Sequence, residues 1–436
     1  MLRVSDNKRF LINADGSPFF YLGDTAWELF HRLDREQADR YLTDRAAKGF
    51  TVIQAVVLSE IDGLSVPNSY GDLPLTDFNL DQPNEAYFKH VDYIVDKAAS
   101  LGLYVGVLPA WGSHVSPRGP VTVQNARRYG QFLGKRYAGK PVIWILGGDR
   151  PPGRNRATWD ELAAGLGEGD GGRGLITYHP CGGESSSRWF HGRPWLDFNM
   201  LQSGHRHTSR NYSRILRDYQ REPAKPTLDG EPAYEYPPDD MSEERPVGEA
   251  QVRRNAYQAV FSGAAGHTYG THPVWQMYDP PRDPMWGVHT PWHKALDLPG
   301  ARQMPHLKAL MLSRPYPTRI PDPSIVLTPQ EEDVDHVCAT RDGLAGTGNA
   351  TYLMAYFPTG RPMSLDVGRI ASKQIRGWWF DPRTGQAGQP WEFANAGATD
   401  FTPPTESGPD WVLVLDGVDS NYPPPGRTQP EASSKP

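Results

Sequence analysis

The sequence predicts an α/β fold, a (β/α)8 TIM barrel, followed by a small all-β sandwich. From residue 19 to about residue 315, short apolar runs alternate with amphipathic helical patterns. Eight such alternations indicate parallel strands joined by right-handed crossovers, for which closure into a barrel is the simplest arrangement. After Arg314-Pro315-Tyr316-Pro317 the helical patterns stop, and short strand-like runs separated by turn signals begin. The 436 residues suffice for a barrel of ~250 residues and a smaller module.

The first half of the predicted barrel has a regular pattern. Phe19–Leu22 is the first strand, and Arg35–Lys48 is a helix that Asp34 can cap and Gly49 can end. The β-branched run Thr51–Val57 is typical of a buried strand. The alternation continues with a helix at Glu85–Leu101, a strand at Leu103–Leu108, a helix at Val123–Arg136 and a strand at Val142–Leu146.

The second half keeps the alternation less regularly. Its candidate strands are Leu175–Tyr178, Trp195–Leu201, Thr227-Leu228 and His267–Tyr269, and its candidate helices are Gln251–Phe261 and His293–Leu312. A doubly wound open sheet is the main alternative to a barrel. That fold favours a glycine-rich phosphate loop after the first strand, and Gly23-Asp24-Thr25-Ala26-Trp27 is not one.

The last part of the chain is typical of a β-sandwich of about a hundred residues. Its strand-like runs are Thr351–Phe357, Ser364–Val367, Gly377–Phe380 and Trp411–Leu415. Asp381–Gly385, between two of them, has the composition of a turn. We therefore expect a barrel over residues 1–316, a sandwich over residues 317–420 and, because residues 421–436 are rich in Pro and Ser, a flexible tail.

Composition and charge narrow the classes of partner. The net charge is −6 and no basic run is present, which argues against nucleic acid and anionic membranes. No stretch of ~18 apolar residues is present, so the sequence predicts no transmembrane helix. The 13 Trp and 20 Tyr residues suit a site that stacks on sugar rings, although core packing accounts for some of them.

The cysteines and the first residues bear on the compartment. Cys181 and Cys338 are the only cysteines, and they form neither a disulfide framework nor a zinc or redox pair. Residues 1–10 lack the apolar run of a signal peptide, so we expect a cytoplasmic protein, while a secreted protein trimmed of its leader would look the same. No motif indicates a cofactor, and the sequence leaves the oligomeric state open.

Two carboxylates stand where a barrel carries its chemistry, at the C-terminal ends of strands. Asp149 follows the fourth predicted strand and Glu231 the seventh, so the two are expected to face each other across the barrel mouth. Carboxyls about 5 to 5.5 Å apart can hydrolyse a glycoside by double displacement, one as nucleophile and the other as acid and then base. Either residue alone is more often a turn or loop residue, but their joint position favours catalysis.

The segments around these carboxylates resemble those of a known family. Trp144-Ile145-Leu146-Gly147-Gly148-Asp149 and Leu228-Asp229-Gly230-Glu231-Pro232 are similar to the acid/base and nucleophile segments of the apiosidase-like glycoside hydrolases (glycoside hydrolase family 140). Gly23–Trp27 and His272–Trp275 also match, and the C-terminal domain is similar to the one that these proteins carry. The resemblance implies a retaining, exo-acting glycosidase for a terminal furanose such as apiose or arabinose, with Asp149 as acid/base and Glu231 as nucleophile.

The residues beside the two carboxylates suit these roles. Many related barrels carry Asn-Glu after strand four, and the shorter Asp149 needs glycines before it that let the backbone come closer. Gly230 and Pro232 are expected to fix the backbone around Glu231. Asp229 is the rival nucleophile, but we expect its side chain to point away from that of Glu231. Glu235 is expected to be a supporting carboxylate.

Further residues at the strand ends are candidates for substrate binding. They are Asp24, Trp27, Gln54, Trp111, His114, His179, Gln202, His267, Tyr269 and Trp275. We expect Trp275 to be a sugar-stacking wall and Tyr269 to hydrogen-bond Glu231. Asp24 and Gln202 suit sugar hydroxyls. His179 and His267 do as well, although a structural role is nearly as well supported for the histidines.

Two other functions stay open at this stage. His205-Arg206-His207 contains the H-x-H pair of metal-dependent amidohydrolases. Those enzymes place the pair at the first strand and not after the sixth, so an exposed loop without metal is favoured. The barrel could also be a carbohydrate-binding protein that has lost activity, but the presence of both carboxylates argues against this.

Overall fold

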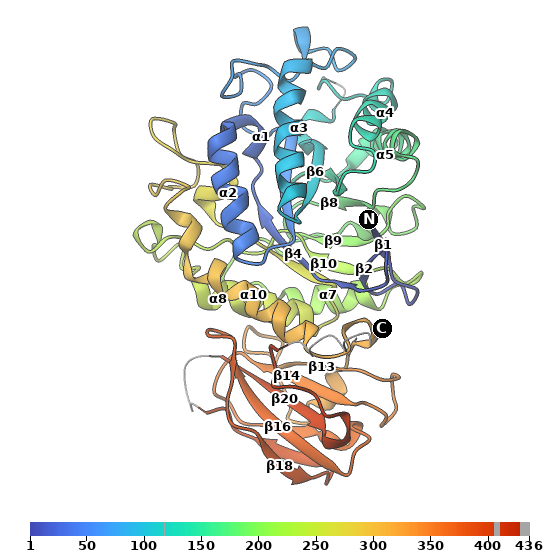
Figure 1. Cartoon of the computed structure of the whole chain (residues 1–436), viewed down its shortest axis with the longest axis vertical. Coiled ribbons are helices and arrows are strands. Elements are labelled where there is room, and N and C mark those ends of the chain that lie inside the picture. Colours follow the sequence, from blue (N-terminus) through green and yellow to red (C-terminus); the bar gives the residue numbers. More distant parts are fainter. Residues whose placement is uncertain (117, 405–409, 428–436) are drawn as a thin grey trace, which may run out of the picture.

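A computed structural model describes residues 1–116, 118–404 and 410–427 and contains a barrel followed by an antiparallel β-domain (Figure 1). Eight parallel strands form the barrel sheet in the order β8-β7-β6-β5-β4-β11-β10-β9. They are β4 (Tyr21–Thr25), β5 (Val52–Leu58), β6 (Tyr104–Ala110), β7 (Val142–Gly147), β8 (Ile176–His179), β9 (Asn199–Leu201), β10 (Thr227–Asp229) and β11 (Gly266–Tyr269). The edge strands meet where Asp197 N donates to Ile176 O at 2.9 Å. The predicted fold class is confirmed.

Helices surround the strands as a barrel requires. The longer ones are α2 (Arg35–Ala47), α3 (Glu85–Ser100), α4 (Ala126–Arg136), α5 (Arg156–Asp170), α7 (Asn211–Tyr219), α8 (Glu249–Phe261) and α10 (Pro299–Leu312), and the short ones are α1 (Leu29–Arg32), α6 (Ser187–Phe190) and α9 (His272–Trp275). Asp34 caps α2 as predicted, because its side chain accepts from Gln37 N at 2.8 Å. The last helix begins at Pro299, six residues after the predicted start at His293.

Helix α5 is absent from the sequence prediction because its glycines weaken the helical signal. The structure shows why they are there. A Cβ at Gly165 would lie 2.1 Å from Arg127 O, and one at Gly130 of α4 would lie 2.5 Å from Leu162 O. Helices α4 and α5 therefore pack backbone against backbone, which only residues without a Cβ permit.

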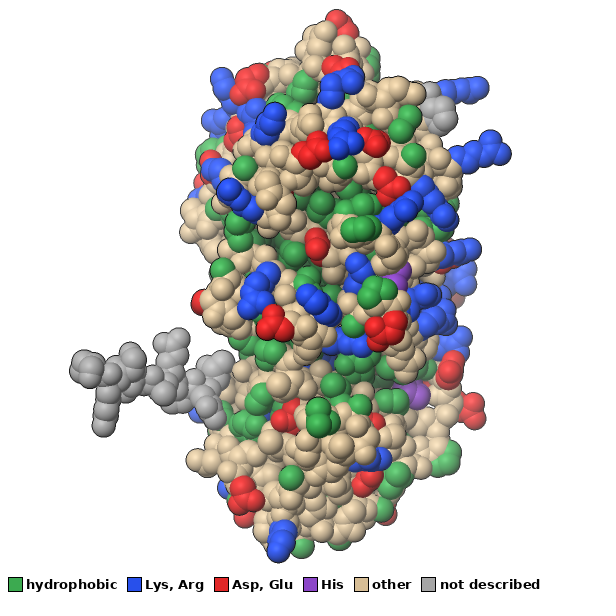
Figure 2. All heavy atoms as spheres, turned by 90° about the vertical axis from the view of Figure 1, so that its right-hand side faces the viewer, with side chains coloured by type: hydrophobic (Ala, Val, Ile, Leu, Met, Phe, Trp, Pro, Cys, Tyr) green, Lys and Arg blue, Asp and Glu red, His purple; other side chains and the backbone are tan. Residues whose placement is uncertain are grey.

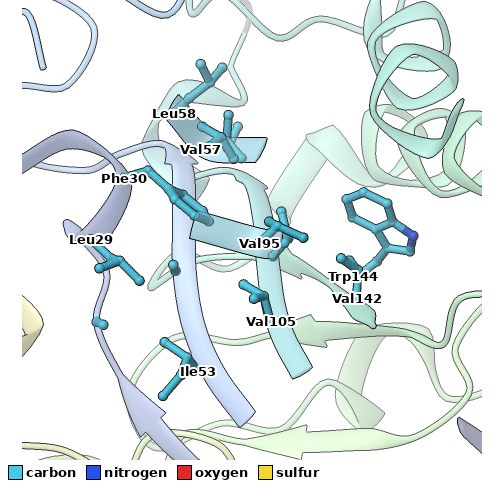
Figure 3. Packing of buried hydrophobic residues seen from close by; sticks show 14 of the residues in the cluster. Leu29, Phe30, Ile53, Val57, Leu58, Val95, Val105, Val142 and Trp144 are labelled. Atoms are coloured by element: carbon cyan, nitrogen blue, oxygen red, sulfur yellow. The ribbon is translucent and has the colours of Figure 1, made fainter. Parts of the chain in front are cut away.

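The strands are buried on both faces, which explains their nearly continuous apolar sequence. Figure 3 shows Ile53 and Val57 of β5, Val105 of β6 and Trp144 of β7 pointing into one cluster with Val95 of α3. Each of these side chains is 1% exposed or less. This packing fixes the strand ends that carry the polar side chains.

The N-terminal end of the barrel is covered by a three-stranded antiparallel sheet that the sequence did not predict. Its strands are β1 (Leu2–Val4), β2 (Leu11–Asn13) and β3 (Pro18–Phe19). Leu2, Leu11 and Phe19 pack in one cluster with Val52 and Ile143 of the barrel. The predicted first strand is therefore corrected: Phe19 belongs to β3, and the barrel strand begins at Tyr21.

The C-terminal domain contains antiparallel β-sheets, as predicted. A seven-stranded sheet has the order β12-β13-β14-β20-β16-β17, with β18 also paired to β16, and β15 pairs with β19. The strands are β12 (Ile320–Pro321), β13 (Cys338–Arg341), β14 (Tyr352–Phe357), β15 (Met363–Asp366), β16 (Gln374–Asp381), β17 (Gln386–Ala387), β18 (Trp391–Ala394), β19 (Ala398–Phe401) and β20 (Trp411–Gly417). Leu353 and Ala355 of β14 pack with β15, while the alternate residues Met354 and Tyr356 pack against the barrel.

The two domains share a buried interface beneath α8 and α10, which lie between them in Figure 1. Arg314 Nε and Nη2 donate to the two carboxylate oxygens of Asp416 at 2.8 and 2.7 Å. Of the predicted tail, residues 421–427 are described, and the Tyr422 hydroxyl lies 2.7 Å from Thr351 Oγ1, so the tail prediction is corrected there. Residues 428–436 lie outside the described part.

The surface in Figure 2 carries basic and acidic side chains interspersed. Within the described ranges, no helix has the length and apolar character that crossing a bilayer requires.

The buried interdomain ion pair leads to a stability prediction. Asp416→Ala leaves the Arg314 guanidinium, whose side chain is 0% exposed, without its counter-ion. We expect the free energy of unfolding to fall by about 3 kcal/mol or more. Glu392→Ala is the control, because Glu392 is half exposed beside Arg376 and its loss should cost less than about 1 kcal/mol. Urea unfolding followed by tryptophan fluorescence measures both, and equal losses would contradict the prediction.

Candidate active site

A cavity of about 840 Å³ opens at the C-terminal ends of the barrel strands. Asp149 and Glu231 both line it, as the sequence predicted from their places after β7 and β10. Four of the predicted substrate-binding residues also line it: Trp27, Trp111, Gln202 and Trp275.

Asp149 is positioned by the two glycines before it. Gly147 and Gly148 have φ of 89° and 123°, and a Cβ would lie 2.2 Å from His179 O at Gly147 and 2.7 Å from the Trp111 ring at Gly148. Gly148 N donates to His179 O at 3.0 Å. Asp149 itself has a φ of 53°, a left-handed conformation that costs a non-glycine residue about 1 kcal/mol or more and is concentrated at functional sites.

Glu231 is positioned by packing around Gly230. A Cβ at Gly230 would lie 2.5 Å from Met200 Cγ, and Gly230 O accepts from Gln54 Nε2 at 3.0 Å. Strand β10 ends at Asp229, so the chain turns before Glu231. Asp229 points elsewhere, as expected, and accepts from Asn211 Nδ2 at 2.9 Å. The turn at Gly230, rather than strand alternation, separates the two carboxylates.

Four side chains contact the Glu231 carboxylate, which is 5% exposed. Gln202 Nε2 donates to Oε2 at 2.8 Å, and His179 Nε2 lies 2.8 Å from the same oxygen. The Tyr234 hydroxyl donates to Oε1 at 2.7 Å, and His205 Nε2 lies 3.3 Å from it. Such a shell stabilises the ionised form of a buried carboxylate.

The surroundings move the pKa values of the two carboxyls in opposite directions. Burial and the charge of Glu231 raise the pKa of Asp149 above its ordinary value. Burial alone would also raise the pKa of Glu231, but the His179 and His205 imidazoles hold it well below its ordinary value. One carboxyl therefore keeps its proton more readily and the other loses it more readily, the division of roles that acid–base chemistry needs.

Aromatic side chains hold His179 against Glu231. The His179 ring lies between two indoles, with ring centroids 5.4 Å from that of Trp27 and 5.8 Å from that of Trp111. Trp275, the predicted stacking wall, is held by its Nε1, which donates to His272 Nδ1 at 3.2 Å.

Other predicted residues are used inside the barrel wall and not in the cavity. Asp24 is fully buried and accepts from Arg45 Nε at 2.6 Å, so its prediction as a ligand for sugar hydroxyls is corrected. Gln54 supports the Gly230 carbonyl. His114 Nε2 lies 3.0 Å or less from one backbone oxygen, that of Ser59, at 2.7 Å.

The last two predicted residues lie on β11, away from the described cavity lining. His267 is 1% exposed, and burial lowers its pKa to about 3. The Tyr269 hydroxyl donates to Glu235 and not to Glu231, so this prediction is corrected. Glu235 is a supporting carboxylate, as expected, and also accepts from Gly300 N at 3.0 Å.

Sequence reasoning missed three residues of the site. Tyr234 supplies the hydroxyl predicted for Tyr269, and its place three residues after Glu231 was the available signal. His205 was assigned to an exposed loop, yet it reaches Glu231. Glu60 follows β5 and lines the cavity, where burial and the charges of Asp149 and Glu231 raise its pKa to about 7.

One group of three possible metal ligands exists among the described residues, beside the cavity loop after β5. His31 Nδ1 lies 2.9 Å from Glu28 Oε2 and 3.5 Å from Asp62 Oδ1. Arg32 already places a cation 3.7 Å from the first of these carboxylates and 3.6 Å from the second. The cluster is thus an internal ion-pair network that anchors the loop.

Comparison with known families identifies the barrel. The model described as "Apiosidase-like, catalytic domain" matches residues 5–318, more than half of the chain. The chain belongs to the apiosidase-like family. Residues 320–416 match a second model, "Putative collagen-binding domain of a collagenase". No curated protein matches the chain.

Solved structures agree with this family assignment. One described as a glycoside hydrolase is 37% identical, with a TM-score of 0.88 and coverage of 96% of this chain and 97% of that chain. A glycoside hydrolase family 5 protein from Bacteroides vulgatus is 35% identical, with a TM-score of 0.89 and coverage of 97% and 94%. The apiosidase-like chain is accordingly a glycoside hydrolase, and the predicted resemblance is confirmed.

The shell of this apiosidase-like site predicts how Glu231 titrates. Tyr234→Phe removes one donor to the ionised carboxylate, so the pKa of Glu231 should rise by about one unit. Protein labelled with carboxyl-13C glutamate reports this by NMR titration, with Glu231→Gln assigning the resonance. Tyr269→Phe is the matched control, because its hydroxyl bonds Glu235. An equal shift in both variants would show that the hydroxyl acts indirectly.

Proposed function

We propose that this glycoside hydrolase retains anomeric configuration, with Asp149 as general acid and base and Glu231 as nucleophile. The observation that supports this is the pair of carboxyls in one cavity whose pKa values are displaced in opposite directions. A nucleophile must be ionised and a general acid protonated in the same resting enzyme. The family match supports an exo-acting enzyme for a terminal furanose such as apiose or arabinose.

The first step forms a glycosyl-enzyme ester. A Glu231 carboxylate oxygen attacks the anomeric carbon while the bond from that carbon to the leaving oxygen breaks. Asp149 transfers its proton to the leaving oxygen, and the leaving group departs as a neutral alcohol. His179 and Gln202 both contact Oε2, and Tyr234 and His205 both contact Oε1, so the carboxylate is held in one orientation for attack.

The second step reverses the roles, and the electrostatics of the pair support the reversal. Once Glu231 is an ester, it no longer carries the charge that raises the pKa of Asp149. Asp149 then favours its ionised form, in which it can take a proton from water as the water oxygen attacks the anomeric carbon. Glu231 leaves as a carboxylate, again stabilised by its donors, and the raised pKa of Asp149 is restored.

Stereochemistry tests the double displacement. We expect NMR of the product first formed from a chromogenic furanoside to show the anomer of the substrate, because two inversions give retention. A panel that includes pyranosides identifies the sugar. Initial release of the opposite anomer would refute a glycosyl-enzyme intermediate.

Azide separates the two roles. Asp149→Asn should still form the intermediate from a substrate with an activated phenol, which needs little proton donation, and the intermediate should accumulate because water lacks its base. Azide needs no deprotonation, so it should restore turnover and give a glycosyl azide of retained configuration.

Glu231→Ala is the counterpart. Azide can occupy the vacated space and attack directly, which gives the inverted azide. NMR distinguishes the products, and an inverted azide from Asp149→Asn would mean that the roles are exchanged.

A further inference from the structure

One side of the cavity is lined by four arginines that the proposed chemistry does not use. They are Arg206, Arg210, Arg214 and Arg217, here called the arginine wall. Among the described residues, none of the four forms an ion pair with a carboxylate. By contrast, Arg188 and Arg221, which line the adjoining hollow, pair with Glu184 and Asp218.

The fold gains nothing evident from this arrangement. Arg210 is the N-cap of α7, and Arg214 and Arg217 follow on the helix, whose first turn has no acidic residue. A helix N-terminus carries partial positive charge, so cations placed there repel it, while an anion would be stabilised. Like charges gathered on one cavity wall are also mutually unfavourable. Both costs fall when an anion occupies the cavity.

The wall is held in place and is not merely loose surface. A Cβ at Gly183, which also lines the cavity, would lie 3.6 Å from Arg214 Nη1. That nitrogen is buried without a hydrogen-bond partner in the described structure. A buried guanidinium nitrogen without a partner is costly, and an acceptor from a ligand would satisfy it.

The C-terminal domain completes this side of the cavity. Glu332 of that domain lines the cavity, and its backbone oxygen accepts from Arg210 Nη1 at 2.5 Å. The Tyr212 hydroxyl donates to Asp333 O at 3.1 Å, and the Tyr212 ring stacks on His336 with centroids 4.5 Å apart. Helix α7 and residues 332–336 thus form one unit, so the second domain helps to position the wall.

We propose that the arginine wall, completed by the C-terminal domain, binds an anionic group on the part of the saccharide that does not react. The inference rests on the proposed function and specifies its substrate class, an acidic saccharide. Carboxylate and sulfate share the required chemistry, because both accept paired N–H donors from a guanidinium.

Binding to full-length Glu231→Gln protein tests this without turnover. Calorimetry compares a short oligouronide with the same oligosaccharide after reduction of its carboxylates to alcohols, and a sulfated neutral oligosaccharide distinguishes sulfate from carboxylate. We expect one of the two anionic probes to bind at least about tenfold more tightly than its neutral counterpart, and this preference to shrink as salt rises. Equal affinities of acidic and neutral probes would overturn the proposal.

Variants locate the preference. Arg214→Gln and Arg217→Gln, each added to Glu231→Gln, should each reduce the preference at least about threefold. Arg302→Gln is the control, because Arg302 is 62% exposed on α10, outside the described cavity lining. A preference that survives both wall variants, or falls equally in the control, would place the anion elsewhere. Failure here with a retained anomer in turnover would sink only the anion site. Anion binding without any glycosidase activity would sink only the catalytic proposal.

Discussion

A buried, ionised carboxylate is stable only where several donors reach it, and this requirement organises the loops around Glu231. The contacts come from different strand ends: His179 ends β8, Gln202 follows β9 and Tyr234 follows β10. They converge only because the chain turns at Gly230, where packing inside the barrel leaves no room for a side chain. Buried residues that touch no substrate thus belong to the structural basis of the site.

The same carboxylate governs its partner. The charge of Glu231 is one cause of the raised pKa of Asp149, so protonation of one depends on the state of the other. Glu60 experiences both charges, and its pKa of about 7 follows from burial together with them. Three carboxyls in one cavity cannot all ionise easily, and the donors around Glu231 determine which one does. Coupling of this kind is what a site that alternates between acid and base requires.

The barrel and the two carboxylates were predictable because strand rhythm and glycine-flanked acids are local signals. The partners of those acids were not, because they depend on side-chain direction. Tyr269 was expected beside Glu231 and bonds Glu235, whereas Tyr234 has the role. Asp24 stands at a strand end as a ligand would, yet Arg45 claims it inside the wall. Helix α5 was missed because its glycines serve a close contact with α4, which composition alone cannot show.

The C-terminal domain is bound to the barrel by more than a linker. Its large sheet buries Met354 and Tyr356 against α8 and α10, so without it an apolar face of those helices would be exposed. Helices α8 and α10 stand on either side of β11, in the same part of the chain as Glu231. Residues 332–336 also pack on α7, next to the cavity. The second domain therefore stabilises the half of the barrel that carries Glu231, and it extends the cavity wall beyond what eight strand ends could build.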